Sequence, residues 1–179
     1  MFPFVRFLSG SLATLWLVAC ATYQPLLNSD RIEQKFGSYG VEVVRQNETR
    51  RVSSLYSLSG GEHITRTWAI VEFLSPNEPA LDKEHEAIFG GASIGRTFRD
   101  AGWTIYKAPL GAEEVVVSTE DAEIGAYMHI NLPARLAAWK YEFVVSREGQ
   151  TFDYARITEI YHPDYLDFED LLRISASPQ

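Results

Sequence analysis

The chain contains one cysteine, Cys20, among its 179 residues. Because a single cysteine cannot form a bridge within the chain, the fold has no disulfide and must be stabilised by its own hydrophobic core. The composition can supply such a core, since 46% of the residues are apolar and 13% are aromatic. At this length we expect one domain, which is too small to hold two enzyme-sized lobes.

Cys20 lies at the end of a short apolar run. Arg6 is the one charged residue before it, and residues 7–21 are mostly apolar. A positive start followed by an apolar segment of this length is typical of a secretory signal peptide, whereas a stable membrane span needs about twenty apolar residues. We therefore expect residues 1–19 to be a signal peptide.

The four residues that end this run, Leu17-Val18-Ala19-Cys20, resemble the lipobox of bacterial lipoproteins. The resemblance implies cleavage before Cys20, a diacylglyceryl group on its sulfur and an acyl chain on its new amine. At about 0.8 kcal/mol for each buried methylene, two or three acyl chains form an effectively permanent membrane anchor. Ala21, which stands where an inner-membrane lipoprotein tends to have aspartate, implies the outer membrane with the domain facing the periplasm.

The net charge of the chain limits the classes of partner that we expect it to bind. Sixteen Lys and Arg residues stand against 24 Asp and Glu residues, for a net charge of −8. Binding of phosphate backbones depends on a basic face, so nucleic acid is excluded as an expected partner. The same acidity excludes a polybasic attachment to anionic lipid, so the expected membrane contact is the lipid anchor alone.

Breaks in periodicity divide the chain after cleavage. Residues 20–38 contain Pro25 and Gly37 and show no sustained pattern, which predicts a lipidated tether. Residues 39–174 are expected to form a single α+β domain, and residues 175–179 a frayed tail. No internal repeat of 20–50 residues is visible.

Alternating apolar residues predict a mainly antiparallel sheet. Residues 67–74 are apolar on both faces, which is typical of a central strand covered on both sides. Residues 147–150 predict the turn of a hairpin between the last two strands. The expected strands are 41–46, 50–58, 67–74, 103–107, 114–118, 127–131, 137–146 and 151–161.

One long helix is expected to pack on this sheet, over about residues 81–101, because apolar and small residues recur there at helical spacing. Gly102 stands where a helix C-terminal glycine belongs, and a short helix is expected over residues 168–174. The residues expected in the core are Trp68, Ile70, Val71, Phe73, Ile88, Phe98, Ile105, Trp139, Tyr141 and Phe143.

The sharpest catalytic motif is Gly91-Ala92-Ser93-Ile94-Gly95, which matches the G-x-S-x-G pattern of a nucleophile elbow. A small serine hydrolase would use Ser93 with an acid (Asp121 or Glu123) and a base (His129 or His162). An elbow needs a strand that leads into the serine, however, and the preceding residues look helical. We therefore favour packing of small residues, and expect no enzyme site.

Other chemistry finds little support in the sequence. The four histidines form no pair at metal-ligand spacing, and residues 120–123 lack the order of a calcium loop. No glycine-rich phosphate loop is present, so neither a metal nor a cofactor is expected.

By elimination, the expected function is binding or assembly at the cell envelope, with an envelope protein or a cell-wall glycan as the partner. A protein partner predicts an exposed apolar patch or an unpaired sheet edge, whereas a glycan predicts exposed aromatic rings. The aromatic residues singled out for this second role are Trp103, Tyr106, Tyr161 and Tyr165.

Overall fold

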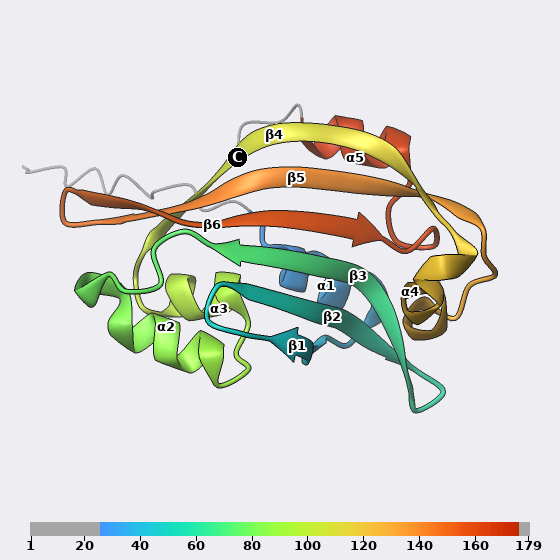
Figure 1. Ribbon diagram of the computed structural model, residues 1–179, viewed down its shortest axis with the longest axis horizontal. Coiled ribbons are helices and arrows are strands. Elements are labelled where there is room, and N and C mark those ends of the chain that lie inside the picture. Colours follow the sequence, from blue (N-terminus) through green and yellow to red (C-terminus); the bar gives the residue numbers. More distant parts are fainter. Residues whose placement is uncertain (1–25, 176–179) are drawn as a thin grey trace, which may run out of the picture.

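The computed structural model describes residues 26–175 of the chain. Six strands form one antiparallel sheet in the order β1-β2-β3-β6-β5-β4 (Figure 1). The α+β class and the mainly antiparallel sheet are therefore confirmed. The strands are β1 (Gly40–Gln46), β2 (Arg50–Ser59), β3 (Glu62–Phe73), β4 (Thr104–Val117), β5 (Ala134–Arg147) and β6 (Gln150–Tyr161).

Two three-stranded meanders meet at the centre of the sheet. β3 pairs with β6, so that Thr67 lies opposite Tyr161 and Phe73 lies opposite Ala155. The central position predicted for residues 67–74 is confirmed, since β3 has a neighbour on each side. The hairpin turn between β5 and β6 is also confirmed, and both of its linking residues, Glu148 and Gly149, have positive φ angles.

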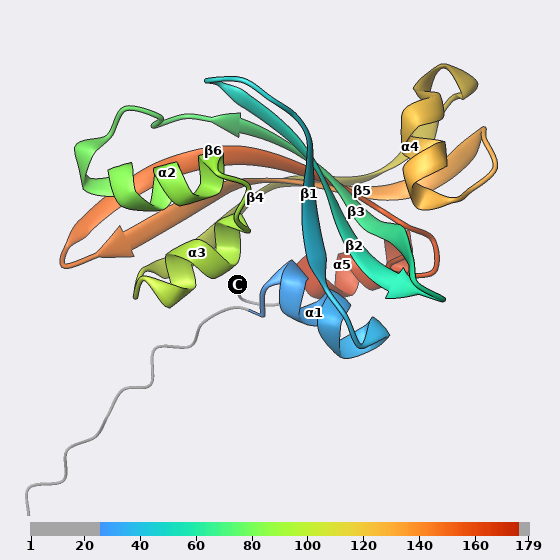
Figure 2. The same cartoon turned by 90° about the horizontal axis from the view of Figure 1, so that it is seen from below.

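In the described part of the chain, five α-helices and two short 3-10 turns accompany the sheet. Figure 2 shows the curvature of the sheet, with α1 and α3 on the side opposite to α4. The helices are α1 (Asn28–Phe36), α2 (Asp82–Phe89), α3 (Ile94–Asp100), α4 (Ala122–Met128) and α5 (Phe168–Ser175), and the turns are η1 (Pro79–Leu81) and η2 (Thr119–Asp121). The expected C-terminal helix is thus present as α5.

The sheet buries apolar side chains on both faces. The larger core lies under α1, α2, α3 and α5 and includes Ile32, Ile88 and Phe98. The smaller core lies on the other face, where Trp68 packs near Met128 of α4. All the residues expected in the core are buried except Ile70, which is half-buried at the edge of the smaller core.

The single long helix expected over residues 81–101 is wrong. The segment forms two helices, α2 and α3, which are separated by residues 90–93. Gly91 has a φ of 105°, a conformation that favours glycine and cannot continue a helix. The apolar spacing predicted one helix because both short helices turn their apolar side chains towards the same core. Ile88 of α2 and Phe98 of α3 are fully buried there.

Three other expectations also need correction. The part of the expected tether that the structure describes contains α1, whose Ile32 is fully buried in the larger core. The strand expected at 127–131 is wrong, because these residues include the end of α4 and the loop after it. The strands expected at 103–107 and 114–118 belong to one strand, β4, which continues through an irregularity between Pro109 and Gly111.

Candidate functional site

A cavity of about 60 Å³ lies between the sheet and the first residues of α1 and α3. Every strand of the sheet contributes to its lining, so the cavity is a feature of the whole fold rather than of one loop. Its apolar walls are Leu27, Val41, Leu55, Ala69, Val71, Ile94, Phe143 and Ile157. Its polar lining residues are Asn28, Ser29, Tyr39, Arg51, Ser53, Ser93, Lys107, Tyr141 and Glu159.

Glu159 of β6 is a buried carboxylate whose hydrogen bonds come from the protein itself. Asn28 Nδ2 donates to Glu159 Oε1 over 3.0 Å, and the Tyr161 hydroxyl donates to Glu159 Oε2 over 2.6 Å. Burial, together with the negative charge of the same carboxylate, raises the pKa of Tyr141. Both oxygens of Glu159 thus accept a hydrogen bond from the protein.

Lys107 of β4 lacks such partners. Its side chain is almost fully buried, with 2% of the residue surface exposed. Within residues 26–175 its ammonium group has no hydrogen bond and no carboxylate oxygen within 4.0 Å. The ammonium nitrogen lies 4.5 Å from the ring centre of Tyr141 and 5.1 Å from the ring centre of Trp139. Burial lowers the pKa of Lys107, and the more distant charge of Glu159 opposes that shift.

Ser29 supplies a second unsatisfied donor. Its hydroxyl is buried, and no group among residues 26–175 forms a hydrogen bond with it. Buried polar groups are normally hydrogen-bonded, because an unpaired one costs about 1–3 kcal/mol. Ser29 and Lys107 line the same small cavity, so two unmet donors are found together.

Arg51 of β2 holds the wall of the cavity to the helical layer. Its Nη1 donates to the carbonyl oxygens of Ile88 and Ala92, over 2.8 and 2.9 Å, and its Nε donates to Ser53 Oγ over 2.6 Å. These bonds satisfy carbonyl groups where the chain passes from α2 to α3. Unlike Lys107, Arg51 therefore has an evident structural role.

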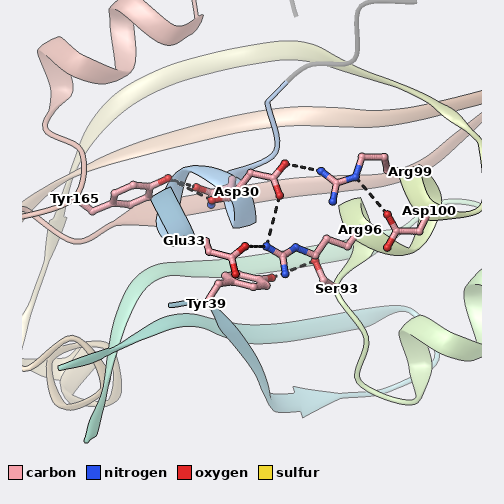
Figure 3. Close-up of polar contacts among 9 residues, drawn as sticks. Asp30, Glu33, Tyr39, Ser93, Arg96, Arg99, Asp100 and Tyr165 are labelled. Atoms are coloured by element: carbon pink, nitrogen blue, oxygen red, sulfur yellow. Dashed lines mark hydrogen bonds and ion pairs between the residues drawn. The ribbon is translucent and has the colours of Figure 1, made fainter. Parts of the chain in front are cut away.

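Ion pairs join α1 to α3 (Figure 3). Asp30 of α1 pairs with Arg99 over 2.5 Å and with Arg96 over 3.5 Å, and Arg96 also pairs with Glu33 over 2.5 Å. The guanidinium of Arg96 in turn lies 4.5 Å from the ring centre of Tyr39. These contacts fix two short helices that have few intrahelical hydrogen bonds of their own.

Ser93 does not have the geometry of a nucleophile elbow. It directly precedes α3, and a helix, α2, leads into its loop where an elbow needs a strand. Its Oγ accepts a hydrogen bond from the Tyr39 hydroxyl over 3.1 Å (Figure 3). The serine thus has a structural partner at the edge of the cavity.

The acids and bases considered for a hydrolase lie elsewhere. Asp121 accepts from the backbone of Ser118, and Glu123 pairs with Arg45. His162 Nε2 lies 3.0 Å from the carbonyl oxygen of Met128, the last residue of α4. His129 directly follows α4. Among residues 26–175 none of these four groups is hydrogen-bonded to Ser93. The same residues contain no cluster of three or more His, Cys, Asp or Glu side chains that could hold a metal ion.

Three of the four aromatic residues singled out for glycan stacking are buried. Trp103, Tyr161 and Tyr165 have 1–2% of their surface exposed, whereas Tyr106 has 49%. The buried rings contribute to the core and, in Tyr161, to the hydrogen bonds of Glu159. They therefore offer no face to a sugar.

The sequence reading missed Lys107, although a signal was present. Trp103, Ile105 and Lys107 alternate along one face of an expected strand, and the first two residues are apolar. A lysine at the next inward position is therefore expected to be buried. The alternation along this strand does not predict which distant residues surround Lys107. The cavity could therefore not be predicted from the sequence.

Comparison with known proteins gives no family for the chain. No protein-family model matches it, and no curated protein matches it. No helix within residues 26–175 is both long enough and apolar enough to cross a bilayer. The lipobox and Cys20 lie outside the described residues. The fold and the cavity are therefore the observations from which a function can be argued.

Proposed function

We propose that the protein is a lipid-anchored binding module of the bacterial cell envelope, which takes a small ligand into the cavity beneath α1 and α3. The lipobox at residues 17–20 supports the anchor, and Ala21 supports the outer membrane as its place. Two features of one cavity carry the binding role: Ser29 Oγ is buried without a hydrogen-bond partner among residues 26–175, and the buried Lys107 makes ring contacts but no hydrogen bond there. A buried charge that has no hydrogen bond and no carboxylate partner costs stability, which favours a role in recognition.

A catalytic role has less support. Glu159, the carboxylate in the cavity, already accepts hydrogen bonds from Asn28 and Tyr161, so it is poorly placed to accept a proton from a substrate. Ser93 lacks a hydrogen-bonded base in the described part of the chain. We therefore propose binding without turnover.

A protein partner is the second candidate, and the edge of the sheet favours it. Within residues 26–175, β4 pairs with β5 alone, and no strand of this part of the chain lies along its other edge. Tyr106, Leu110 and Val116 of this strand are 49–63% exposed. Apolar residues on an unpaired edge strand favour the addition of a partner's strand.

Native mass spectrometry of the full chain, purified from membranes in mild detergent, tests the cavity. We expect a non-covalent small molecule on the wild-type protein and its loss in Lys107→Met. Lys140→Met is the matched control, since Lys140 is an exposed lysine on the neighbouring strand β5. An equal mass for all three proteins, after correction for the substitutions, would contradict a binding role for the cavity.

The anchor makes a separate prediction. Replacing Cys20 with serine removes the sulfur that the lipoprotein class acylates, so we expect loss of acyl labelling and release of the protein from membranes. Fractionation of cells and labelling with an acyl probe measure both effects. Ser29→Ala is a control that leaves the lipobox intact. Unchanged membrane association of the Cys20→Ser protein would exclude the lipid anchor.

A further inference from the structure

We infer that the ligand is a small monocarboxylate with a short alkyl chain, whose carboxylate binds Lys107 Nζ and Ser29 Oγ. This inference rests on the proposed function, namely that the cavity is a binding site. It goes further by naming the class of ligand from three properties of the lining: its unmet donors, its volume and its charge.

The donor groups of the lining residues favour a ligand that accepts hydrogen bonds. Glu159 already receives hydrogen bonds from Asn28 and Tyr161, so it does not require a cationic ligand. Ser29 Oγ, in contrast, is buried without a hydrogen-bond partner among the described residues, and Lys107 contacts two aromatic rings there but makes no hydrogen bond. A ligand that satisfies this site therefore brings acceptor atoms, and an anion satisfies an ammonium group best.

The volume of the cavity limits the size of that anion. One water molecule needs about 10–15 Å³ of such a cavity. A cavity of about 60 Å³ therefore holds about four to six non-hydrogen atoms. Carboxylates with two to four carbons have this size. Ser29 and Lys107 both line this cavity.

The charges and the walls favour one negative charge joined to an apolar group. Arg51 donates its Nε and Nη1 to protein oxygens, whereas Lys107 has no hydrogen bond among residues 26–175, so Lys107 is the cation with the greater need of an acceptor. A second negative charge would be repelled by Glu159, whose carboxylate is near enough to act on Lys107. The many aliphatic wall residues suit an alkyl chain, whereas they would leave the outer oxygens of phosphate without donors.

The depth of the lining residues gives the ligand its orientation. Ser29, Lys107 and Glu159 are buried, whereas Val41 and Ile94 are half-buried. The mouth of the cavity therefore lies between β1 and the start of α3. We place the carboxylate at the deep end and the alkyl chain towards Val41 and Ile94.

Isothermal titration of the full chain in detergent, in a buffer free of carboxylates and phosphate, tests the ligand class. We expect sodium propionate to bind the wild type and Lys140→Met with affinities within about twofold. Its affinity for Lys107→Met should fall at least about tenfold, and its affinity for Ser29→Ala should fall about three- to tenfold. Propionamide, which has the same shape without the charge, and inorganic phosphate should each bind the wild type at least about tenfold more weakly than propionate.

Three results would overturn the inference: no measurable binding of propionate, equal binding to Lys107→Met, or tighter binding of phosphate. The failure of this inference can be told from the failure of the proposed function. If propionate does not bind but native mass spectrometry finds another molecule that depends on Lys107, the carboxylate class is wrong and the binding site stands. If neither experiment finds a ligand, both proposals fail.

Discussion

Replacing Arg51 with methionine is expected to lower the free energy of unfolding by about 2–5 kcal/mol. The guanidinium of Arg51 is fully buried and donates to the carbonyl oxygens of Ile88 and Ala92 and to the hydroxyl of Ser53. Methionine fills much of the same volume, but it leaves these oxygens without their donor. The link between β2 and the turn that joins α2 to α3 would be lost.

The neighbouring Arg50 provides a matched control, because it begins the same strand and is exposed. Arg50→Met should change the free energy of unfolding by less than about 0.5 kcal/mol. Denaturation by urea, followed by circular dichroism, measures both variants. Equal, small effects of the two substitutions would show that the buried hydrogen bonds of Arg51 do not hold the helical layer to the sheet.

Ile88→Ala is expected to cost about 2–5 kcal/mol. Ile88 ends the buried face of α2 and is fully enclosed in the larger core, so truncation leaves a cavity as well as removing apolar contacts. Leu58→Ala removes a similar side chain that is 49% exposed, and should cost far less. A loss below about 0.5 kcal/mol for Ile88→Ala would mean that α2 contributes little to the core.

The strands were the part of the fold that the sequence predicted best. Residues 67–74 carry apolar side chains on both faces, and in β3 these side chains enter two separate cores. The hairpin between β5 and β6 was equally evident, because Gly149 lies between two alternating segments. Both features are local, and the period of two fixes which residues share a face.

The helices were predicted less well because their limits depend on single residues and on packing. A helical spacing that continues from Ile88 to Phe98 does not reveal the break at Gly91, which is set by one backbone angle. Residues 28–36 looked like part of a tether because a single short amphipathic segment is a weak signal of a helix. The burial of Ile32 against the sheet and the ion pairs of Asp30 stabilise this helix, and both come from distant residues.

The candidate site was the hardest feature to foresee. The search for motifs selected Ser93, which lies at the edge of the cavity with a structural hydrogen bond. Lys107 belongs to no motif, and its importance comes from its position between Tyr141 and Trp139 and from the partners it lacks. A missing partner is a property of three-dimensional packing, so no single sequence pattern reports it.

The most direct test of the binding site compares the stability of the wild type and Lys107→Met without added ligand. If Lys107 serves recognition, methionine should raise the free energy of unfolding at pH 7 by about 1–4 kcal/mol, because it removes a buried charge that has no hydrogen bond or carboxylate partner among residues 26–175. The gain should shrink as the pH rises. Burial lowers the pKa of Lys107 in the folded protein below its ordinary value of 10.5, so between these two values the unfolded wild type binds more protons and its stability increases with pH.

Urea denaturation of both proteins, in the same detergent and from pH 7 to pH 10, is the measurement. The account predicts that Lys107→Met is the more stable protein at pH 7 and that the difference narrows towards pH 10. A Lys107→Met protein that is less stable than the wild type at pH 7 would contradict it, because Lys107 would then be a structural residue.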